Sequence, residues 1–489
     1  MTRAQTPEAS ASNPASRQAT TKASPHTSPK TPAADPGRIE LGTRRELCID
    51  DYLFERFDGV ELRLQKPVPR NVALDHDAPW EGNTCCYHTV FQDDRLFRMY
   101  YRGSHYDATR TNRSSQVVCY AESSDGIYWN RPELGLVNFK GSTRNNIVWD
   151  GIGSHNFTPF RDPNPDCREG EEYKALASGK GGLYAFKSAD GVHWSLLADS
   201  PVITRGAFDS QNLAFWDPLR ECYVDYHRHF VEVDGKRVRH IMTCTSTDFR
   251  TWTEPEWLDF GDAPLEHLYT NAVTPYYRAP HIYLGFPKRF APHRSMFGHE
   301  HRGVSDAVFM TSRDGLRFNR WGEALVRPGL QPERWENRNN MTAWGILETA
   351  NDLPTAPPEL SIFTTEGYYR GASCRLRRFT VRMDGFVSAS APLSGGELIT
   401  RPFSFEGQAL GLNVATSAAG AARVEVRDEA GAVVPGFSLD DCDEIYGDHL
   451  ERTVTWKGSG DVSGLQGKPV RLRFALSDAD LYSLRFTAR

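Results

Sequence analysis

Residues 120–129 read YAESSDGIYW, a strand-like run that ends in an Asp-Gly turn and an aromatic residue. The same arrangement returns in FKSADGVHW (186–194), CTSTDFRTW (244–252) and MTSRDGLRF (310–318), and a fainter copy, FTVRMDGFV, lies at 379–387. Asp-Gly suits a tight turn because glycine accepts a positive φ, and the aromatic residue begins the next strand and packs back on the sheet. Each copy therefore predicts a β-hairpin.

The spacing of these copies predicts how the hairpins are assembled. Their aspartates are separated by 58 to 70 residues, which leaves room for four strands in each copy: Asp125, Asp190, Asp248, Asp314 and Asp384. Regular repeats of this size are typical of propeller blades. The segments between them are short runs rich in Val, Tyr, Phe and Thr, without long amphipathic helices. The sequence predicts an all-β chain whose main domain is a five-bladed β-propeller.

Three regions are expected along the chain. Residues 1–37 consist of Ser, Thr, Ala and Pro with almost no large apolar residue, which predicts a disordered tail. Residues 38–390 hold the repeats, and ELCIDDYLFERF (46–57) is expected to complete or cover an open sheet edge. Residues 391–489 contain alternating strands such as ARVEVRD and VRLRFALS between Gly-rich turns, which predicts a small antiparallel β-sandwich.

Composition excludes several classes of protein. Lys and Arg number 57 against 63 Asp and Glu, for a net charge of −6, whereas a protein built to neutralise phosphates is basic. No apolar run reaches the roughly 18 residues of a membrane helix. The nine cysteines form no C-x-x-C pair, and no phosphate loop or nucleophile elbow is present. We expect no nucleic-acid or membrane partner, no cofactor and no metal. The tail lacks the apolar core of a signal peptide, so a cytoplasmic location is expected by default; the oligomeric state is left open.

Candidate catalytic acids follow from aligning the blades. The first, innermost strand of each blade lines the axis of a propeller, so residues where these strands start converge. The blades align on the polar residue that ends each innermost strand: Asp93, Asp162, Asp217, Arg278 and Glu348. Twelve residues earlier stand Glu81, Asp150, Glu266 and Glu336; the third blade has Gly206 eleven residues earlier and offers Asp209 in its place. We expect the catalytic acids among Glu81, Asp209, Glu266 and Glu336.

Amide, imidazole and aromatic side chains near the same strand starts suit sugar binding, because they bond hydroxyl groups or stack on sugar faces. The expected set is Trp80, His155, Asn156, Asn212, His267, Tyr269, Asn271 and Asn340. A structural alternative stands beside each of these predictions. In this alternative, the polar and acidic side chains accept the backbone N–H groups of turns, and the aromatic rings pack in the core.

Three segments resemble a known family: LCIDDYLFERFDGVELRLQKP (47–67), SSDGIYWNRPELGLVNFKGSTRNNIV (123–148) and FDSQNLAFWDPLRECYV (208–224). They are similar to bacterial proteins described as similar to glycoside hydrolase family 32, whose wider relatives are families 43, 68 and 117. The C-terminal region looks like the sandwich that accompanies them. The resemblance implies a five-bladed propeller with glycosidase or transglycosidase activity and three acids around a central funnel. It implies Glu81 as nucleophile or base, Asp209 as stabiliser and Glu266 as general acid, although PWEGNT (79–84) has Glu where the family has Asp.

The leading hypothesis is hydrolysis of a glycosidic bond, of a furanoside or other terminal sugar, by an exo-acting enzyme. Hydrolysis needs one carboxylic acid to protonate the leaving oxygen and one carboxylate as nucleophile or base. One alternative is a non-catalytic carbohydrate-binding propeller. The other is a transglycosidase or a lyase, and a lyase needs a His or Tyr base near a cation that neutralises a uronate, for which Arg102, Arg278 and Arg302 are candidates.

Two further patterns are interpreted as structural. FRDPNPD (160–166) and Glu221-Cys222 imitate acidic motifs of invertases, but both follow an innermost strand, which favours turn roles. His227 and His229 alternate on a strand, and two histidines without a third ligand do not predict a metal site.

Overall fold

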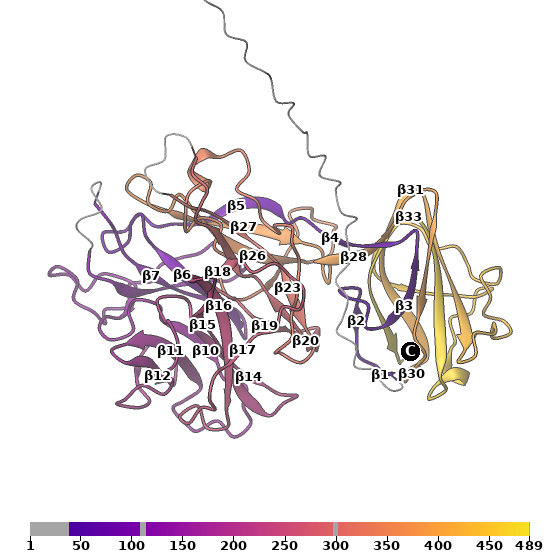
Figure 1. Ribbon diagram of the computed structural model, residues 1–489, viewed down its shortest axis with the longest axis horizontal. Helices are drawn as coiled ribbons and strands as arrows, with labels where there is room; N and C mark the ends of the chain where they lie inside the picture. The colour runs from indigo at the N-terminus through magenta and orange to yellow at the C-terminus, as the bar shows by residue number, and fades with distance from the viewer. Residues whose placement is uncertain (1–38, 108–113, 297–301, 489) are drawn as a thin grey trace, which may run out of the picture.

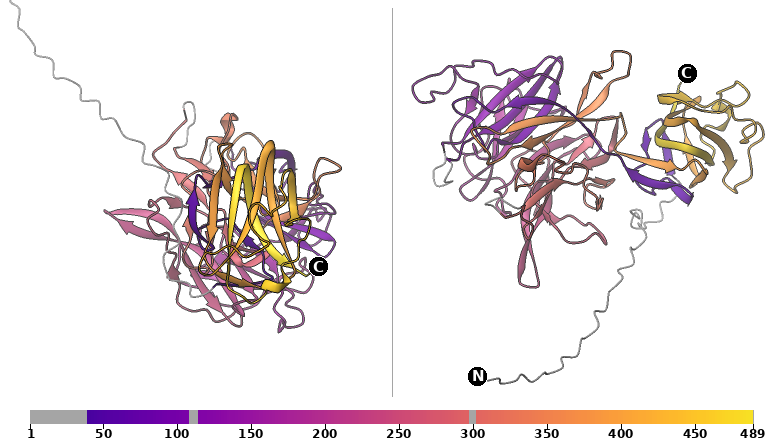
Figure 2. Two further views of the ribbon diagram at one scale, coloured as in Figure 1. Left: turned by 90° about the vertical axis from the view of Figure 1, so that its right-hand side faces the viewer. Right: turned by 90° about the horizontal axis from the view of Figure 1, so that it is seen from above.

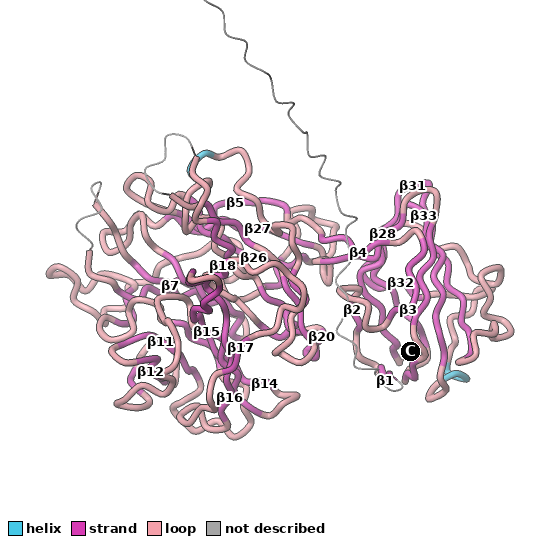
Figure 3. Tube along the Cα trace, viewed as in Figure 1, coloured by secondary structure: helices cyan, strands magenta, loops and turns pink. Residues whose placement is uncertain are grey.

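The computed structural model describes residues 39–107, 114–296 and 302–488. Within these ranges the chain consists of strands and loops, with only two three-residue 3-10 helices, Pro332–Arg334 and Ser463–Leu465 (Figure 3). The prediction of an all-β chain is confirmed. The predicted disordered tail lies outside the described residues. No helix in the described part of the chain is long and apolar enough to cross a membrane.

Five four-stranded antiparallel sheets follow one another along the chain (Figure 1). The first contains β6 (Cys86–Asp93), β7 (Leu96–Gly103), β8 (Val117–Ser123) and β9 (Ile147–Trp149). The second contains β10 (Thr158–Arg161), β11 (Tyr173–Gly179), β12 (Gly182–Ser188) and β13 (Ser195–Leu196). The third contains β14 (Leu213–Asp217), β15 (Cys222–Val233), β16 (Lys236–Ser246) and β17 (Glu256–Trp257).

The last two of these sheets are built less regularly. The fourth contains β19 (Thr274–Tyr276), β20 (Ala279–Gly285), β23 (Met310–Ser312) and β24 (Asn319–Arg320). Beside it lies a three-stranded sheet of β18 (His267–Leu268), β21 (Lys288–Ala291) and β22 (Val304–Ala307). The fifth contains β25 (Leu347–Thr349), β26 (Glu359–Glu366), β27 (Arg375–Val381) and β5 (Val68–Asp75). Residues 68–75 therefore complete the fifth sheet, whereas strands of the segment 46–57 pair with residues of the C-terminal region.

The four strong sequence repeats form one kind of turn. In the second copy the Ser188 hydroxyl accepts the Gly191 backbone N–H at 2.9 Å, and the Asp190 carboxylate accepts the N–H groups of Val192 and His193 at 2.8 Å. The same bonds occur at Asp125, Asp248 and Asp314. In the third copy Phe249 adopts a φ of 62°, where the other copies have glycine. The aspartate thus satisfies backbone donors that the turn leaves without strand partners.

Neighbouring sheets are joined by tyrosine hydroxyls. Tyr100 on β7 donates to the Gly191 carbonyl of the next sheet at 2.7 Å. Tyr223 on β15 donates to the Asp162 carboxylate that follows β10, at 2.7 Å. Asp93 and Asp217, which end β6 and β14, each accept the corresponding tyrosine of the following sheet, Tyr173 and Tyr283. The first strands also lie against one another, β25 beside β6, β6 beside β10 and β10 beside β14.

A ten-stranded sheet forms a second body beside the five smaller sheets (Figure 2). It takes strands from both ends of the described chain. The N-terminal ones are β1 (Ile39–Gly42), β2 (Glu46–Leu47), β3 (Phe54–Asp58) and β4 (Glu61–Leu64). The C-terminal ones are β28 (Val387–Ala391), β29 (Gly396–Thr400), β30 (Phe403–Phe405), β31 (Ala409–Asp428), β32 (Asp448–Thr453) and β33 (Val470–Thr487). The boundary near residue 390 and the sandwich architecture stay predictions.

Buried ion pairs join the two bodies. Arg313, from the fourth repeated turn, lies 2.8 Å from Asp50, and it also pairs with Glu46 of β2 at 2.5 Å. Asp384, the aspartate of the fifth and faintest copy, is buried and pairs with Arg45 at 3.2 Å and Arg278 at 2.8 Å. The fifth copy therefore serves this contact between the bodies, and the chain continues from it into β28 of the larger sheet.

Candidate active site

The segments that precede the first strands of the five sheets meet at one end of those strands, which we call the N-terminal face. Asn156, just before β10, donates to the Ser210 carbonyl at 2.5 Å, and the Ser210 hydroxyl donates to the Tyr269 carbonyl. Gln211, just before β14, donates to the His88 carbonyl of β6 at 3.0 Å. Segments far apart in the sequence are thus held together, as the aligned strand starts predicted.

An aspartate–histidine pair lies on this face. The Asp209 carboxylate is 2.7 Å from Nε2 of His155, and its side chain is 61% exposed. Nε2 of His155 donates to Asp209, because an ionised carboxylate only accepts, while Nδ1 lies 3.1 Å from Oε1 of Gln116 and 3.2 Å from the Arg102 guanidinium. This bond holds the pKa of the Asp209 carboxyl well below its usual range. The site therefore presents an ionised carboxylate with a fixed orientation.

Two buried phenols accompany the pair. The hydroxyl of Tyr87 lies 2.6 Å from that of Tyr269, and the Tyr87 ring is 5.6 Å from the His155 ring between centroids. Burial raises the pKa of both phenols, in Tyr87 reinforced by its neighbour Tyr269. Both hydroxyls consequently stay protonated; one of them donates to the other, which leaves the second with a proton that it can donate to a ligand.

Four cations surround the ring of Tyr269. Lys288 Nζ lies 4.5 Å from the ring centroid, and the guanidinium carbons of Arg228, Arg338 and Arg239 lie at 5.2, 5.4 and 5.9 Å. We call these four residues the cationic cluster. Within the described part of the chain, none of them forms an ion pair with a carboxylate. The surroundings of the Tyr269 ring therefore hold four cations, and Asp209 is an acid that interacts with Arg338 and Arg228.

The fold explains how these four residues meet. Tyr226 on β15 pairs with Leu213, the first residue of β14, so the hairpin β15–β16 continues past the start of β14 and carries Arg228 and Arg239 beyond it. Lys288 begins β21, which follows the strand paired with β19. Arg338 lies in the loop before β25, with a φ of 69°. Sequence reasoning missed the cluster because no local spacing links these positions.

The other predicted acids have partners of their own. Glu81 is buried, accepts the Tyr101 hydroxyl at 2.5 Å and pairs with Arg131 at 2.5 Å, while burial raises its pKa. Glu266 pairs with Arg289 at 3.2 Å and with Arg320. Glu336 is buried 2.8 Å from Arg370. The structure brings Asp209 together with His155 and Tyr269, whereas Glu81 and Glu266 lie in separate ion pairs, and catalytic roles for these acids stay predictions.

The predicted sugar-binding side chains mostly bond to the protein itself. The four asparagines Asn156, Asn212, Asn271 and Asn340 donate to backbone carbonyls. Trp80 donates to the Asn146 side chain at 2.6 Å, and His267 lies 3.2 Å from the Arg239 guanidinium. These bonds shape the loops of the N-terminal face, and a direct sugar contact by these residues stays a prediction.

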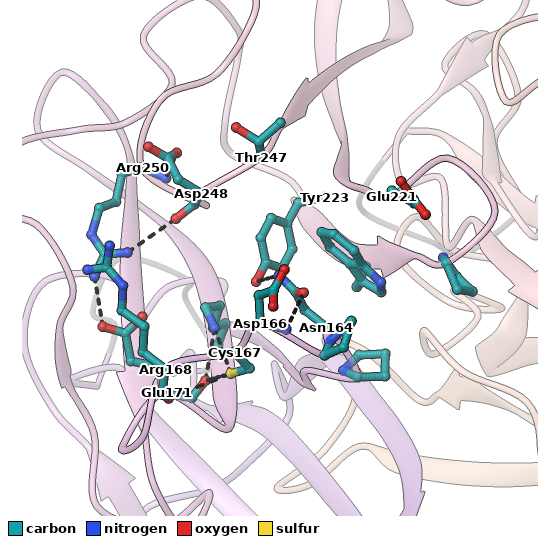
Figure 4. Close-up of a pocket in the computed structure, with 15 residues that line it drawn as sticks. Asn164, Asp166, Cys167, Arg168, Glu171, Glu221, Tyr223, Thr247, Asp248 and Arg250 are labelled. Carbon is teal, nitrogen blue, oxygen red and sulfur yellow. Dashed lines mark hydrogen bonds and ion pairs between the residues drawn. The ribbon is translucent and has the colours of Figure 1, made fainter.

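A cavity of about 540 Å³ lies at the opposite, C-terminal ends of β10 and β14, which we call the C-terminal face (Figure 4). The FRDPNPD segment and the turn that contains Glu221 line it. Asp162 accepts the Asn164 backbone N–H at 3.0 Å and pairs with buried Lys174 at 2.5 Å, which confirms its turn role. We place the candidate site on the N-terminal face because two cations that line the cavity, Lys174 and Arg250, are each paired with an acid, Asp162 and Glu171.

One group in the described residues has the donors of a metal site: Asp225, His227 and Cys244, all buried. Nδ1 of His227 lies 2.5 Å from the Asp225 carboxylate, and Cys244 Sγ lies 3.6 Å from it. Asp225 and Cys244 are direct cross-strand partners, so pairing β15 with β16 would have found the third ligand that the two histidines lacked. The group supports the loop of Asp209, since His227 Nε2 lies 3.0 Å from the Arg205 carbonyl.

No family model and no curated protein sequence matches the chain. Among solved structures, a glycoside hydrolase is similar with a TM-score of 0.42 and 13% identity, covering 64% of this chain and 92% of that one. An N-acetylgalactosamine deacetylase from F. plautii has a TM-score of 0.42 and 13% identity over 67% of this chain and 97% of its own. The GH62 α-L-arabinofuranosidase catalytic domain of Coprinopsis cinerea has a TM-score of 0.42 and 8% identity over 65% and 99%. Membership of glycoside hydrolase family 32 stays a prediction.

Proposed function

We propose that this chain is a glycosidase with its active site on the N-terminal face. In this proposal the five four-stranded sheets are the blades of a propeller, and the ten-stranded sheet is an attached β-sandwich. Three observations support the architecture. The sheets follow one another in sequence, and tyrosine hydroxyls form hydrogen bonds between neighbouring sheets. The first strands of neighbouring sheets also lie side by side. A terminal sugar, furanosidic or otherwise, is then cleaved in exo fashion where the first strands start.

The Asp209–His155 pair carries the proposal. A glycosidase needs a carboxylate that is ionised at neutral pH and accessible to the sugar, and Asp209 is both. His155 fixes its orientation and helps to keep it charged. Asp209 then acts as base or nucleophile, rather than as the stabiliser that the family resemblance implied. The protonated phenols of Tyr87 and Tyr269 lie beside it, and the one that does not donate to the other can donate to the leaving oxygen or to a sugar hydroxyl.

The test compares the wild-type protein with Asp209→Asn and His155→Gln on a panel of aryl glycosides and polysaccharides. Asn keeps the shape of the side chain and removes its charge, so Asp209→Asn should lower the rate by at least about 100-fold. Its unfolding midpoint should stay unchanged because the side chain is largely exposed. Full activity in Asp209→Asn would contradict the proposal, and binding without turnover by the wild type would favour a non-catalytic sugar-binding protein.

A lyase is the second candidate, favoured by the two phenols and the histidine beside a cationic cluster. In β-elimination a base removes the proton next to the uronate carboxylate, the glycosidic oxygen leaves with its bonding electrons, and a carbon–carbon double bond forms. A cation next to the carboxylate stabilises the charge that develops during proton removal. Hydrolysis adds water and gives no double bond, so ultraviolet absorption of the products separates the two reactions.

A further inference from the structure

The cationic cluster differs from two other cations of the described chain, Lys174 and Arg313, which have carboxylate partners. Lys174 is 2% exposed and pairs with Asp162 at 2.5 Å, and Arg313 is flanked by Glu46 and Asp50. Lys288 is 1% exposed, yet its ammonium group is bonded to the neutral Asn337 side chain at 3.0 Å. A buried charge without a counterion is unfavourable, and the chain provides counterions for Lys174 and Arg313.

Mutual repulsion makes this arrangement costlier still. Four cations lie within 6 Å of one phenol ring, where like charges disfavour one another. Burial lowers the pKa of Lys288 well below its usual range, and Arg338 and Arg239 lower it further. Asp209 is the acid that faces the cluster electrostatically, but it lies on the exposed rim and is bonded to His155. The cluster therefore keeps an excess of positive charge.

We propose that this cluster is an anion subsite, in which Arg228, Arg239, Lys288 and Arg338 bind a carboxylate or sulfate group of the carbohydrate. The carbohydrate part of this inference rests on the proposed function. Guanidinium groups bind carboxylate and sulfate oxygens through paired N–H donors, and a lysine adds a point charge. Nε of Arg239 is buried without a hydrogen-bond partner among the described residues, so a donor is available. The substrate is then an acidic sugar, such as a uronate or a sulfated sugar.

Sodium sulfate and sodium acetate are the probes, titrated into the full chain by calorimetry, with sodium chloride at matched ionic strength as the reference. We expect saturable binding of at least one anion, at least about tenfold weaker in Arg338→Gln and in Arg239→Gln. Arg56→Gln removes the same charge from an exposed position of the ten-stranded sheet and should bind like the wild type. Tighter binding of acetate than of sulfate indicates a uronate, and tighter binding of sulfate indicates a sulfated sugar.

The inference is overturned if the wild type, Arg338→Gln and Arg239→Gln bind both anions equally, or if neither anion binds better than chloride. Because Arg338→Gln and Arg239→Gln are independent, misfolding of one leaves the other to decide. Anion binding needs no turnover, and Asp209→Asn should keep it. Binding retained in a protein that cleaves no glycoside would therefore refute the proposed function alone, whereas cleavage of neutral glycosides without anion binding would refute this inference alone.

Discussion

The two ends of the same five strands differ in how their charges are arranged. On the C-terminal face, charged side chains close on each other: Asp162 pairs with Lys174, and Glu171 lies 2.7 Å from Arg250. On the N-terminal face, four cations gather around Tyr269 without a carboxylate partner among the described residues, and Asp209, which interacts with Arg338 and Arg228, is exposed. Lys174 and Arg250 of the C-terminal face are thus neutralised within the protein, which favours a structural role for these pairs.

This difference indicates where to look for function. Charges that the fold neutralises contribute to stability, whereas charges left without counterions reduce stability and are available to a ligand. A large cavity is therefore a weaker guide in this molecule than the balance of charge around it. Variants on the two faces should separate into effects on stability and effects on ligand binding.

The largest effect is expected from Lys174→Met on the C-terminal face. This change leaves the Asp162 carboxylate buried without its cation, which should lower the free energy of unfolding by about 3–5 kcal/mol. Urea unfolding measures it, and the double variant with Asp162→Asn should recover part of the loss. An unchanged unfolding midpoint in Lys174→Met would show that the C-terminal face does not depend on its paired charges.

Replacing one tyrosine on each face by phenylalanine should change the free energy of unfolding by smaller amounts, and by more on the C-terminal face. Tyr223→Phe removes a bond to the ionised Asp162 between neighbouring sheets and should cost about 1.5–3 kcal/mol. Tyr87→Phe removes a bond between two neutral phenols on the N-terminal face and should cost about 1 kcal/mol. Chemical denaturation of both variants checks the order, and a larger loss in Tyr87→Phe would reverse the comparison.

As the pH falls, the buried His88 near the N-terminal face should lower the free energy of unfolding before Glu171 of the C-terminal face does. Burial lowers the pKa of His88 from 6.5 to about 3, so neutral His88 contributes stability that is complete above about pH 6.5 and is lost as the pH falls toward 3. On the C-terminal face burial opposes ionisation of Glu171, but Arg250 more than offsets it and its pKa stays below the usual value. Unfolding free energies between about pH 7 and pH 5 should fall, with a shallower slope in His88→Gln. Equal slopes in the two proteins would exclude His88 as the cause.

The smallest effect on stability is expected from Arg338→Gln. Removing one cation relieves repulsion within the cluster while it loses the contacts with the rings of Tyr269 and Tyr368, so the free energy of unfolding should change by less than about 0.5 kcal/mol. Denaturant unfolding beside Lys174→Met measures the contrast. A loss as large as that of Lys174→Met would make Arg338 a structural residue.

The sequence predicts those parts of the molecule that rest on local chemistry. The Ser-x-Asp turns follow from the residues at 123–129 and their copies, and aligning the strands placed Asp209 and His155 on one face. Residues 46–57 contribute strands to the ten-stranded sheet, but their partners were not predicted, because strand partners separated by most of the chain leave no local signal. The cationic cluster was missed for the same reason, since Arg228, Lys288 and Arg338 belong to a hairpin extension, a strand of another sheet and a loop.

The most direct test of the account is release of reducing ends from acidic and neutral polysaccharides by the wild type and by Asp209→Asn. We expect the wild type to cleave an acidic polysaccharide, and Asp209→Asn to be at least about 100-fold slower while it unfolds at the same denaturant concentration. Equal rates in the two proteins, or no cleavage of any polysaccharide by the wild type, would contradict the assignment of the N-terminal face as the active site.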